Sequence, residues 1–506
     1  MTSASLMSVT APLLLVLVGG LAALGAEPFL RRTAKHAWLP WIAAFFLVLA
    51  GLVQAFAVPG QLHGILAVDT PRLWLSMAVI GATLVSLGGL QQTLSRDGYQ
   101  GGEPYALTMF AAAGVLVMVL AADLLALFVG LEIASLSVYA LVGLRRHNLE
   151  SNEGLFKYFV MGAVFSAIFL YGAALTYGAT GSTHFGQVAL AGRQPLLIAG
   201  ATLMAIGLLF KVGAVPFHFW SPDAYTGAPV AVTGFMGAVI KVGGFAALGA
   251  IWLNLAAALS SGASVVGVLP LDAVVNLSAE AAKVLHPLSV VFLVAGLASI
   301  IIGNLSALRQ TAARRIVAFS SVAHAGYMLM ALVIADDGGR LALGSLWYYL
   351  AGYAVATAGA LTALAALSGA NDEGDDLHHL AGQGRISPFH GLVLTVFIAS
   401  FAGLPPTVGF LGKFLVFADL VAKDQLLVAI AAMIFAVIGA AYYLRLLVAI
   451  WAPKDKIPAV TAPDLLARWG LAAAAVTVVV LVAASDHLTR PGQSAGAPAV
   501  PAHAVK

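Results

Sequence analysis

Residues 207–229 read GLLFKVGAVPFHFWSPDAYTGAP, an apolar stretch that contains a lysine, a proline and a histidine in its middle. A proline inside a helix removes a backbone hydrogen bond, so Pro216 is expected to break the helix that carries Lys211. At membrane depth, freed carbonyls are tolerated only where they face protein or water. The stretch therefore predicts a broken helix beside a buried cation, an arrangement that transporters use at ion sites.

The composition places the whole chain in a membrane. Of its 506 residues, 61% are hydrophobic and only 9% are charged, whereas soluble domains carry about 25% charged residues. The apolar runs are long and do not alternate with a period of two, which favours helices over barrel strands. The chain is thus predicted to be an all-α polytopic membrane protein. A net charge of only +3 gives no sign of a nucleic-acid partner.

The chain contains no cysteine. This excludes disulfides, iron–sulfur ligation and thiol chemistry within it. Its 12 histidines show neither haem-attachment nor zinc spacing. We therefore expect it to bind no metal and no cofactor, so that any associated electron transfer takes place on another polypeptide.

About fourteen apolar runs predict as many transmembrane helices, since a span needs about 20 apolar residues. They are 9–29, 38–58, 70–92, 105–121, 123–144, 154–178, 195–219, 228–255, 287–308, 315–335, 340–368, 387–422, 425–451 and 465–485. The run 387–422 is too long for one simple span and contains Pro405-Pro406, which predicts a second broken helix.

Lysine and arginine are more frequent in alternate loops, and the positive-inside rule then places both termini on the outer side. No positive residue precedes the first apolar run, whereas Arg31 and Arg32 follow it. A signal peptide carries its positive charge first, so this run is interpreted as a transmembrane helix. The connector 370–386 carries four acidic residues. It is interpreted as a solvated loop, the alternative being a contact with a neighbouring subunit.

Four charged residues lie inside apolar runs: Glu132, Lys211, Lys241 and Lys413. A charge at the bilayer centre costs at least ~2.5–3.5 kcal/mol, so such residues usually face a polar interior and have a function. Burial disfavours the charged form of each, an opposite charge favours it, and neighbouring groups titrate together. One acid cannot neutralise three lysines. The set therefore predicts a proton path, although a static ion pair remains the alternative for any single lysine.

Three further residues are weaker candidates for this path. His218 and His324 could transfer protons near neutral pH, the alternative being packed, hydrogen-bonded histidines. Lys157 lies one turn after Glu153, so an interfacial ion pair explains it equally well.

Five sequence blocks resemble the antiporter-like membrane subunits of proton-pumping NADH–quinone oxidoreductase (respiratory complex I), and together they cover about residues 100–450. The blocks are LEIASLSVYALVGLRR, EGLFKYFVMGAVFSAIFLYGA, FKVGAVPFHFWSPDAYTGAPVAVTGFM, GNLSALRQTAARRIVAFSSVAHAGYM and FAGLPPTVGFLGKF. Within this family, Tyr225 in PDAYTGAP resembles the N-type subunits. M-type, L-type and cation/proton antiporter subunits usually show a histidine at that position.

The resemblance implies a fold of fourteen helices with two inverted five-helix repeats, helices 4–8 and helices 9–13. It also implies that Glu132 is the family's motif glutamate, Lys211 its partner, Lys241 the central lysine and Lys413 the terminal one. His218 and His324 would belong to the central chain of polar residues. The implied division is three N-terminal helices, a first repeat, an outer connector, a second repeat, and a C-terminal helix with its tail, at 1–104, 105–255, 256–286, 287–451 and 452–506.

The resemblance further implies a proton-translocating subunit in a bacterial plasma (inner) membrane, among lipids and other membrane and peripheral subunits, homologous antiporter-like subunits included. NADH, FMN, iron–sulfur clusters and quinone would then be bound by those partners. Two alternatives remain at this point: a subunit of a cation/proton antiporter without a redox partner, and a structural subunit that conducts no protons.

Overall fold

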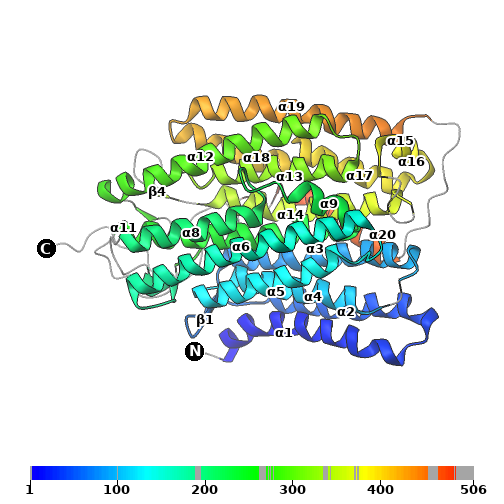
Figure 1. Ribbon diagram of the computed structural model, residues 1–506, viewed down its shortest axis with the longest axis horizontal. Helices are drawn as coiled ribbons and strands as arrows, with labels where there is room; N and C mark the ends of the chain where they lie inside the picture. Colours follow the sequence, from blue (N-terminus) through cyan, green and yellow to red (C-terminus); the bar gives the residue numbers. More distant parts are fainter. Residues whose placement is uncertain are drawn as a thin grey trace.

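Long helices lie side by side through the whole molecule in the computed structural model (Figure 1). The structure describes residues 3–99, 101–188, 195–260, 269–271, 273, 275–276, 278–333, 340–341, 343–369, 372, 375–453, 465–483 and 485. The predicted C-terminal tail lies outside these residues, as does part of the outer connector.

The helices of the N-terminal part follow the predicted apolar runs. They are α1 Ser3–Ala26, the short 3-10 helix η1 Glu27–Phe29, α2 Arg32–Ala55, α3 Thr70–Arg96, α4 Glu103–Leu120, α5 Leu124–Val142, α6 Leu149–Thr180, α7 Phe185–Val188, α8 Pro195–Val212, α9 Ser221–Gly227, α10 Val230–Phe235, the π-helical segment η2 Met236–Ile240 and α11 Lys241–Ser260.

The remaining helices are α12 Ala279–Leu308, α13 Ala313–Met330, α14 Gly344–Leu367, α15 Leu377–Leu380, α16 Gln383–Ile386, α17 Pro388–Ala402, α18 Val408–Ala422, α19 Leu426–Trp451 and α20 Leu465–Val480. Four short strands form two two-stranded sheets in the loops. Strand β1 Gly60–Leu62 pairs antiparallel with β2 Leu66–Val68, and β3 Val275–Asn276 pairs antiparallel with β4 Arg340–Leu341.

Each of the fourteen predicted runs contains a helix, but fewer helices qualify as spans by length and composition. Eleven of the described helices do so, or twelve if α15–α16 and α17, bent by 119°, count as one span. Helix α13 contains two arginines and a histidine, and α20 has only 16 residues. The prediction of an all-α polytopic membrane protein is therefore confirmed, whereas the number of spans depends on these polar or short helices.

The first predicted break is confirmed. Helix α8 ends at Val212 and α9 begins at Ser221, with Pro216 between them. The backbone N–H of Val215 donates to the hydroxyl of Ser299 on α12, at 2.9 Å. A freed polar group of the break is thus satisfied inside the protein, as the membrane environment requires.

The second predicted break is also confirmed, because α17 ends at Ala402 and α18 begins at Val408, on either side of Pro405-Pro406. Gly403 terminates α17 with a φ of +82°, a conformation that favours glycine. A third irregularity was not predicted: the helix through α10 and α11 winds as a π-helix just before Lys241. Such π-turns are frequent at functional sites.

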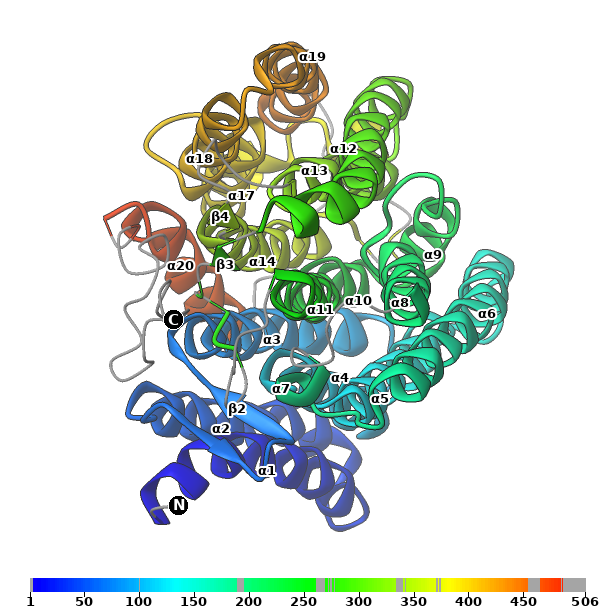
Figure 2. The ribbon, with the colours of Figure 1, turned by 90° about the vertical axis from the view of Figure 1, so that its left-hand side faces the viewer.

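Two helices are surrounded by protein on all sides. The spans Val230–Ser260 and Gly344–Leu367 are 100% buried within their apolar windows. Figure 2, in which most helices are seen end-on, shows α11 and α14 in the middle of the bundle. Polar side chains on these two helices therefore face other parts of this chain.

The prediction that 370–386 is a solvated loop is wrong for two of its acids. The Asp372 side chain is fully buried and pairs with Arg96 at 2.8 Å and with Arg145 at 2.9 Å. It also accepts the backbone N–H of Val230, the first residue of α10, at 3.0 Å. A buried carboxylate needs such partners, because leaving it unpaired would be very unfavourable.

The second buried acid, Asp375, accepts from the guanidinium of Arg314 on α13 at 2.5 Å. That guanidinium also donates to the carbonyls of Thr226 and Ala228, at 2.6 and 2.9 Å. The loop therefore holds together the ends of α3, α9, α10 and α13.

Candidate functional site

Lys211 lies near the end of α8, just before the first break. Its ammonium donates to the hydroxyl of Ser135 on α5 at 2.6 Å, and Ser135 in turn donates to the carbonyl of Leu131 at 2.5 Å. The rings of Tyr139 and Tyr158 each lie 5.4 Å from the Lys211 nitrogen. Aromatic faces at this distance attract a cation, so the site can hold a charge without a carboxylate in contact.

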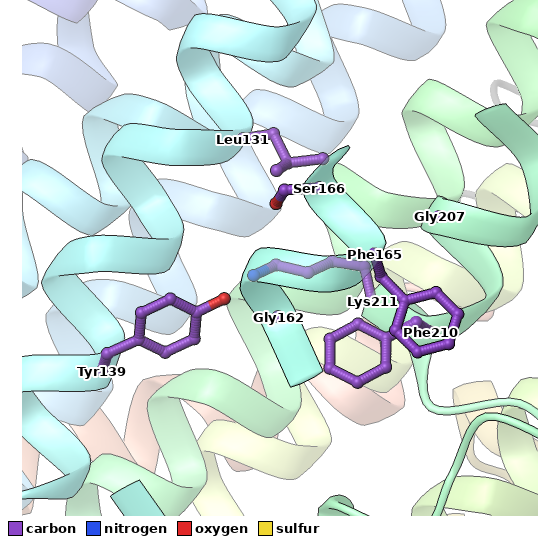
Figure 3. Close-up of a pocket in the computed structure, with 8 residues that line it drawn as sticks. All are labelled: Leu131, Tyr139, Gly162, Phe165, Ser166, Gly207, Phe210 and Lys211. Atoms are coloured by element: carbon purple, nitrogen blue, oxygen red, sulfur yellow. The ribbon is translucent and has the colours of Figure 1, made fainter. Parts of the chain in front are cut away.

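A small cavity of about 10 Å³ adjoins this nitrogen. It is lined by Leu131, Tyr139, Gly162, Phe165, Ser166, Gly207, Phe210 and Lys211. In Figure 3 the Lys211 amine and the Tyr139 hydroxyl both point into it. A Cβ at position 162 would overlap the Tyr139 hydroxyl. Glycine at this position therefore leaves space for that hydroxyl. Its lining combines apolar residues with the polar side chains of Tyr139, Ser166 and Lys211, and its volume is about what one water molecule needs.

Glu132 lies on α5, one turn before Ser135. The predicted contact pair of Glu132 with Lys211 is not formed: within the described residues Glu132 has no ion pair, and its Oε1 is buried without a hydrogen-bond partner. The carboxylate is nevertheless within electrostatic range of Lys211. The two residues thus lie close enough to interact electrostatically, but the direct hydrogen-bond partner of Lys211 is Ser135.

Lys241 begins α11, directly after the π-helical segment, and is buried. Its ammonium donates to the backbone carbonyl of Ser321 on α13 and lies 5.5 Å from the ring of Tyr353 on α14. The hydroxyls of Ser321 and Tyr225 are 3.2 Å apart. The lysine therefore contacts the helix that also carries His324.

His324 is held by two tyrosine hydroxyls. Its Nδ1 is 2.7 Å from the hydroxyl of Tyr349 and its Nε2 is 3.1 Å from that of Tyr443. Both Lys241 and Lys413 are within electrostatic range of the ring. His324 is therefore fully hydrogen-bonded, as expected for a packed histidine. It also has two buried lysines within electrostatic range, as expected for a member of a proton path.

Lys413 lies in α18, after the second break. Its ammonium donates to the backbone carbonyl of Phe401 at 2.6 Å and lies 5.4 Å from the ring of Tyr327. In an unbroken helix that carbonyl would accept from the residue four positions later. This residue is Pro405, which has no N–H, so the lysine supplies the missing donor.

The two remaining candidates are not brought together with the lysines. His218 lies in the first break, and among the described residues its Nδ1 has no hydrogen-bond partner. Lys157 pairs with Glu153 at 2.6 Å and with Asp223 at 2.7 Å, and 44% of its side chain is exposed. Its geometry fits the interfacial ion pair that the sequence also allowed.

Sequence reasoning missed Ser135 and the tyrosines on both sides of His324. A signal existed for Ser135, which follows Glu132 by three positions and so lies on the same face of the helix. No local pattern marks Tyr349 or Tyr443 as partners of a histidine on another helix. In the part of the chain that the structure describes, no group of three or more His, Asp or Glu could hold a metal ion.

Comparisons with known proteins agree with the sequence blocks. A family model described as NADH:quinone oxidoreductase/Mrp antiporter, TM, matches residues 121–269 and 253–439. NADH-quinone oxidoreductase subunit N 1 of Koribacter versatilis (strain Ellin345) is 35% identical over 438 residues, which cover 81% of this chain and 80% of the relative. Subunit N of Mycobacterium tuberculosis (strain ATCC 25618 / H37Rv) is 33% identical, with 93% and 94% covered.

Solved structures show the same fold. A chain of respiratory complex I from Thermus thermophilus with bound Aureothin has a TM-score of 0.74 and 31% identity, covering 93% of this chain and 96% of that chain. A chain of the membrane-bound sulfane sulfur reductase, an archaeal respiratory membrane complex, has a TM-score of 0.80 at 19% identity and covers 96% and 98%. A chain of the Mrp complex from Dietzia sp. DQ12-45-1b has a TM-score of 0.77 at 20% identity, with the same coverage. These two similarities show the fold alone.

The family model spans more than half of the chain, and N subunits above 30% identity align with most of it. The chain therefore belongs to the antiporter-like membrane subunits of NADH–quinone oxidoreductase, and among these to the N subunits.

Proposed function

We propose that Lys211, Lys241 and Lys413, together with Glu132 and His324, form the proton path of this complex I subunit. NADH oxidation and quinone reduction take place on partner subunits, which hold FMN, the iron–sulfur clusters and the quinone. The subunit lies in a bacterial plasma membrane with both termini on the outer side. Its path crosses two antiporter-like repeats, 105–255 and 287–451.

One observation carries this proposal: each buried lysine is bonded to a neutral oxygen. The acceptors are the Ser135 hydroxyl and the carbonyls of Ser321 and Phe401. The three lysines are only 4%, 4% and 6% exposed. A lysine with a purely structural charge is expected to contact a carboxylate, because an uncompensated buried charge is strongly destabilising. Neutral acceptors instead accommodate both the ammonium and the uncharged amine, which a proton carrier must alternate between.

The mechanism follows from these contacts. An electrostatic change that arrives from a neighbouring subunit alters the attraction between Glu132 and Lys211. The Lys211 ammonium then gives up its proton, becomes an amine, and Lys241 takes up the charge. His324, between Lys241 and Lys413, transfers it onward through its hydrogen bonds to tyrosine hydroxyls. Release from Lys413 on the other side and renewed uptake at Lys211 close the cycle.

The test is NADH-driven proton uptake and quinone reduction in inverted membrane vesicles that carry Lys211→Ala, with assembly of the complex checked on a native gel. Lys283→Ala, which removes an exposed lysine of α12, is the matched control. We expect the assembled Lys211 variant to lose proton uptake or its coupling to quinone reduction, by more than about tenfold, and the control to match the parent.

Unchanged proton uptake in the Lys211 variant would contradict the proposal and reassign that lysine to a structural role. The same vesicles can be used to test the antiporter alternative, by measuring sodium–proton exchange without NADH. Exchange of sodium for protons without NADH, lost in Lys211→Ala, would favour a cation/proton antiporter.

A further inference from the structure

We infer that Ser135 is a second, competing partner for Lys211, and that transfer of the lysine between Glu132 and Ser135 is a step of its proton cycle. This inference rests on the proposed function and adds a residue to it. Ser135 is fully buried, and its hydroxyl is in direct hydrogen-bond contact with the Lys211 nitrogen.

The bonding of Ser135 makes it an acceptor for the lysine. A hydroxyl has one hydrogen to donate and lone pairs to accept with. The hydrogen is already donated to the carbonyl of Leu131, at 2.5 Å, so the oxygen is left to accept from Lys211. This bond to the preceding turn also fixes the direction in which the lone pairs point.

Glu132 offers the alternative position. Residues three apart on a helix are neighbours on its surface, so the carboxylate and the hydroxyl lie on adjacent turns of α5. Glu132 is within electrostatic range of Lys211, and its buried Oε1 has no hydrogen-bond partner among the described residues. A buried acceptor without a donor is unfavourable. Movement of the lysine nitrogen toward Glu132 would satisfy it.

Glu132 and Ser135 differ in how strongly they bind the ammonium and the uncharged amine of Lys211. The Glu132 carboxylate attracts the ammonium strongly and the uncharged amine weakly. The neutral Ser135 hydroxyl can accept an N–H from either form. Lys211 therefore receives its proton while it is attracted to Glu132. When it is hydrogen-bonded to Ser135, it can release that proton and keep the hydrogen bond as an uncharged amine. The adjacent cavity, with room for about one water, is a suitable place for the departing proton to go.

Substitution of the hydroxyl tests this step. Ser135→Ala removes the acceptor and leaves Lys211 with Glu132 alone, which slows proton release. We expect about a tenfold loss of NADH-driven proton uptake in assembled complex, because hydrogen bonds to charged groups are the stronger ones. Ser135→Thr keeps the hydroxyl and its bond to Leu131, and should retain most of the activity. Ser135→Cys, of similar size with a weakly bonding thiol, repeats the alanine test if that variant fails to assemble.

Ser137→Ala is the matched control. Ser137 is a buried serine of the same helix, 7% exposed, and residues two apart point in different directions. This variant is expected to pump like the parent. A cryo-EM structure of the complex with Ser135→Ala should show the Lys211 nitrogen on the Glu132 carboxylate.

The outcomes separate this inference from the function on which it rests. Parent-like pumping in Ser135→Ala, with Lys211→Ala inactive, overturns the role of Ser135 and leaves the proposed function standing. Equal losses in Ser135→Ala and Ser135→Thr assign the effect to packing and also overturn it. A Lys211 nitrogen that stays in place in the alanine variant excludes the competition. Activity in Lys211→Ala overturns both proposals together.

Discussion

Lys211 and Lys413 are both buried beside a broken helix, yet they are bonded in different ways. Lys211 precedes its break and donates to a side chain of another helix, the hydroxyl of Ser135. Lys413 follows its break and donates to the backbone of the broken helix itself, at the carbonyl of Phe401. The first lysine can change partners without disturbing the backbone, whereas the second also completes a helix end.

The charged and aromatic groups around the two lysines also differ. An acid, Glu132, is within electrostatic range of Lys211, and two tyrosine rings are close to it. For Lys413 the corresponding ring is that of Tyr327. A switchable lysine next to an acid is suited to receiving a signal. A lysine fixed to a backbone carbonyl is suited to holding a proton at a constant position.

The largest expected effect comes from removing each lysine. Lys211→Ala and Lys413→Ala should both lower NADH-driven proton uptake by more than about tenfold. Only Lys413→Ala should also lower stability, by about 1–3 kcal/mol, because the carbonyl of Phe401 loses its donor and Pro405 cannot replace it. The thermal denaturation of the assembled complex, measured beside its pumping, checks this. Equal loss of stability in both variants would abolish the distinction between the two sites.

Two glycines at the breaks provide a matched pair with a smaller effect. Gly213 and Gly403 both have positive φ angles, +71° and +82°, so alanine is strained at either position, by about 1–2 kcal/mol. An added Cβ at Gly403 would lie 3.3 Å from Cδ and 3.4 Å from Nζ of Lys413. At Gly213 its nearest neighbour would be 3.9 Å away, on Trp220.

Gly403→Ala is therefore expected to lower proton uptake several-fold, and Gly213→Ala to lower stability alone. Proton uptake at equal levels of assembled complex is the measurement. If Gly213→Ala lowered pumping as much as Gly403→Ala, the effect would arise from the helix breaks in general and not from contact with Lys413.

The smallest expected effect concerns the tryptophan that supports the first break. The indole N–H of Trp220 donates to the carbonyl of Phe210 at 3.0 Å, and its ring stacks on Tyr158 with centroids 4.1 Å apart. Trp220→Phe keeps an aromatic ring but loses the donor, which should cost about 1 kcal/mol. Trp252 is the control, because among the described residues its buried indole N–H has no partner.

Thermal denaturation of the two assembled variants compares them directly. Trp252→Phe should cost less than Trp220→Phe, since no hydrogen bond is lost. The reverse order would show that the N–H of Trp220 does not stabilise the break beside Lys211.

Local physical chemistry accounts for what the sequence predicted correctly. Long apolar runs identify membrane helices, and proline ends a helix wherever it stands, so the breaks at Pro216 and Pro405-Pro406 could be predicted without any tertiary contact. The cost of burying a charge marked Glu132 and the three lysines for the same reason. The polarity of α13 shows the limit of this approach, because a helix enclosed by other helices need not itself be apolar.

The partners of these residues depend on contacts between distant parts of the chain. Ser135 lies far from Lys211 in sequence, and the carbonyl of Ser321 far from Lys241. The position of Ser135 one turn after Glu132 was a local signal, but which lysine donates to which oxygen depends on the packing of distant helices. The connector 370–386 was predicted to be a solvated loop because its four charges are visible in the local sequence. The burial of Asp372 and Asp375 depends on Arg96, Arg145 and Arg314 from other segments. Sequence patterns alone thus identified the charged side chains that lie inside apolar helices. The oxygens that accept from the three lysines follow from tertiary packing, because hydrogen bonds form between atoms that the packing of helices brings within about 3 Å.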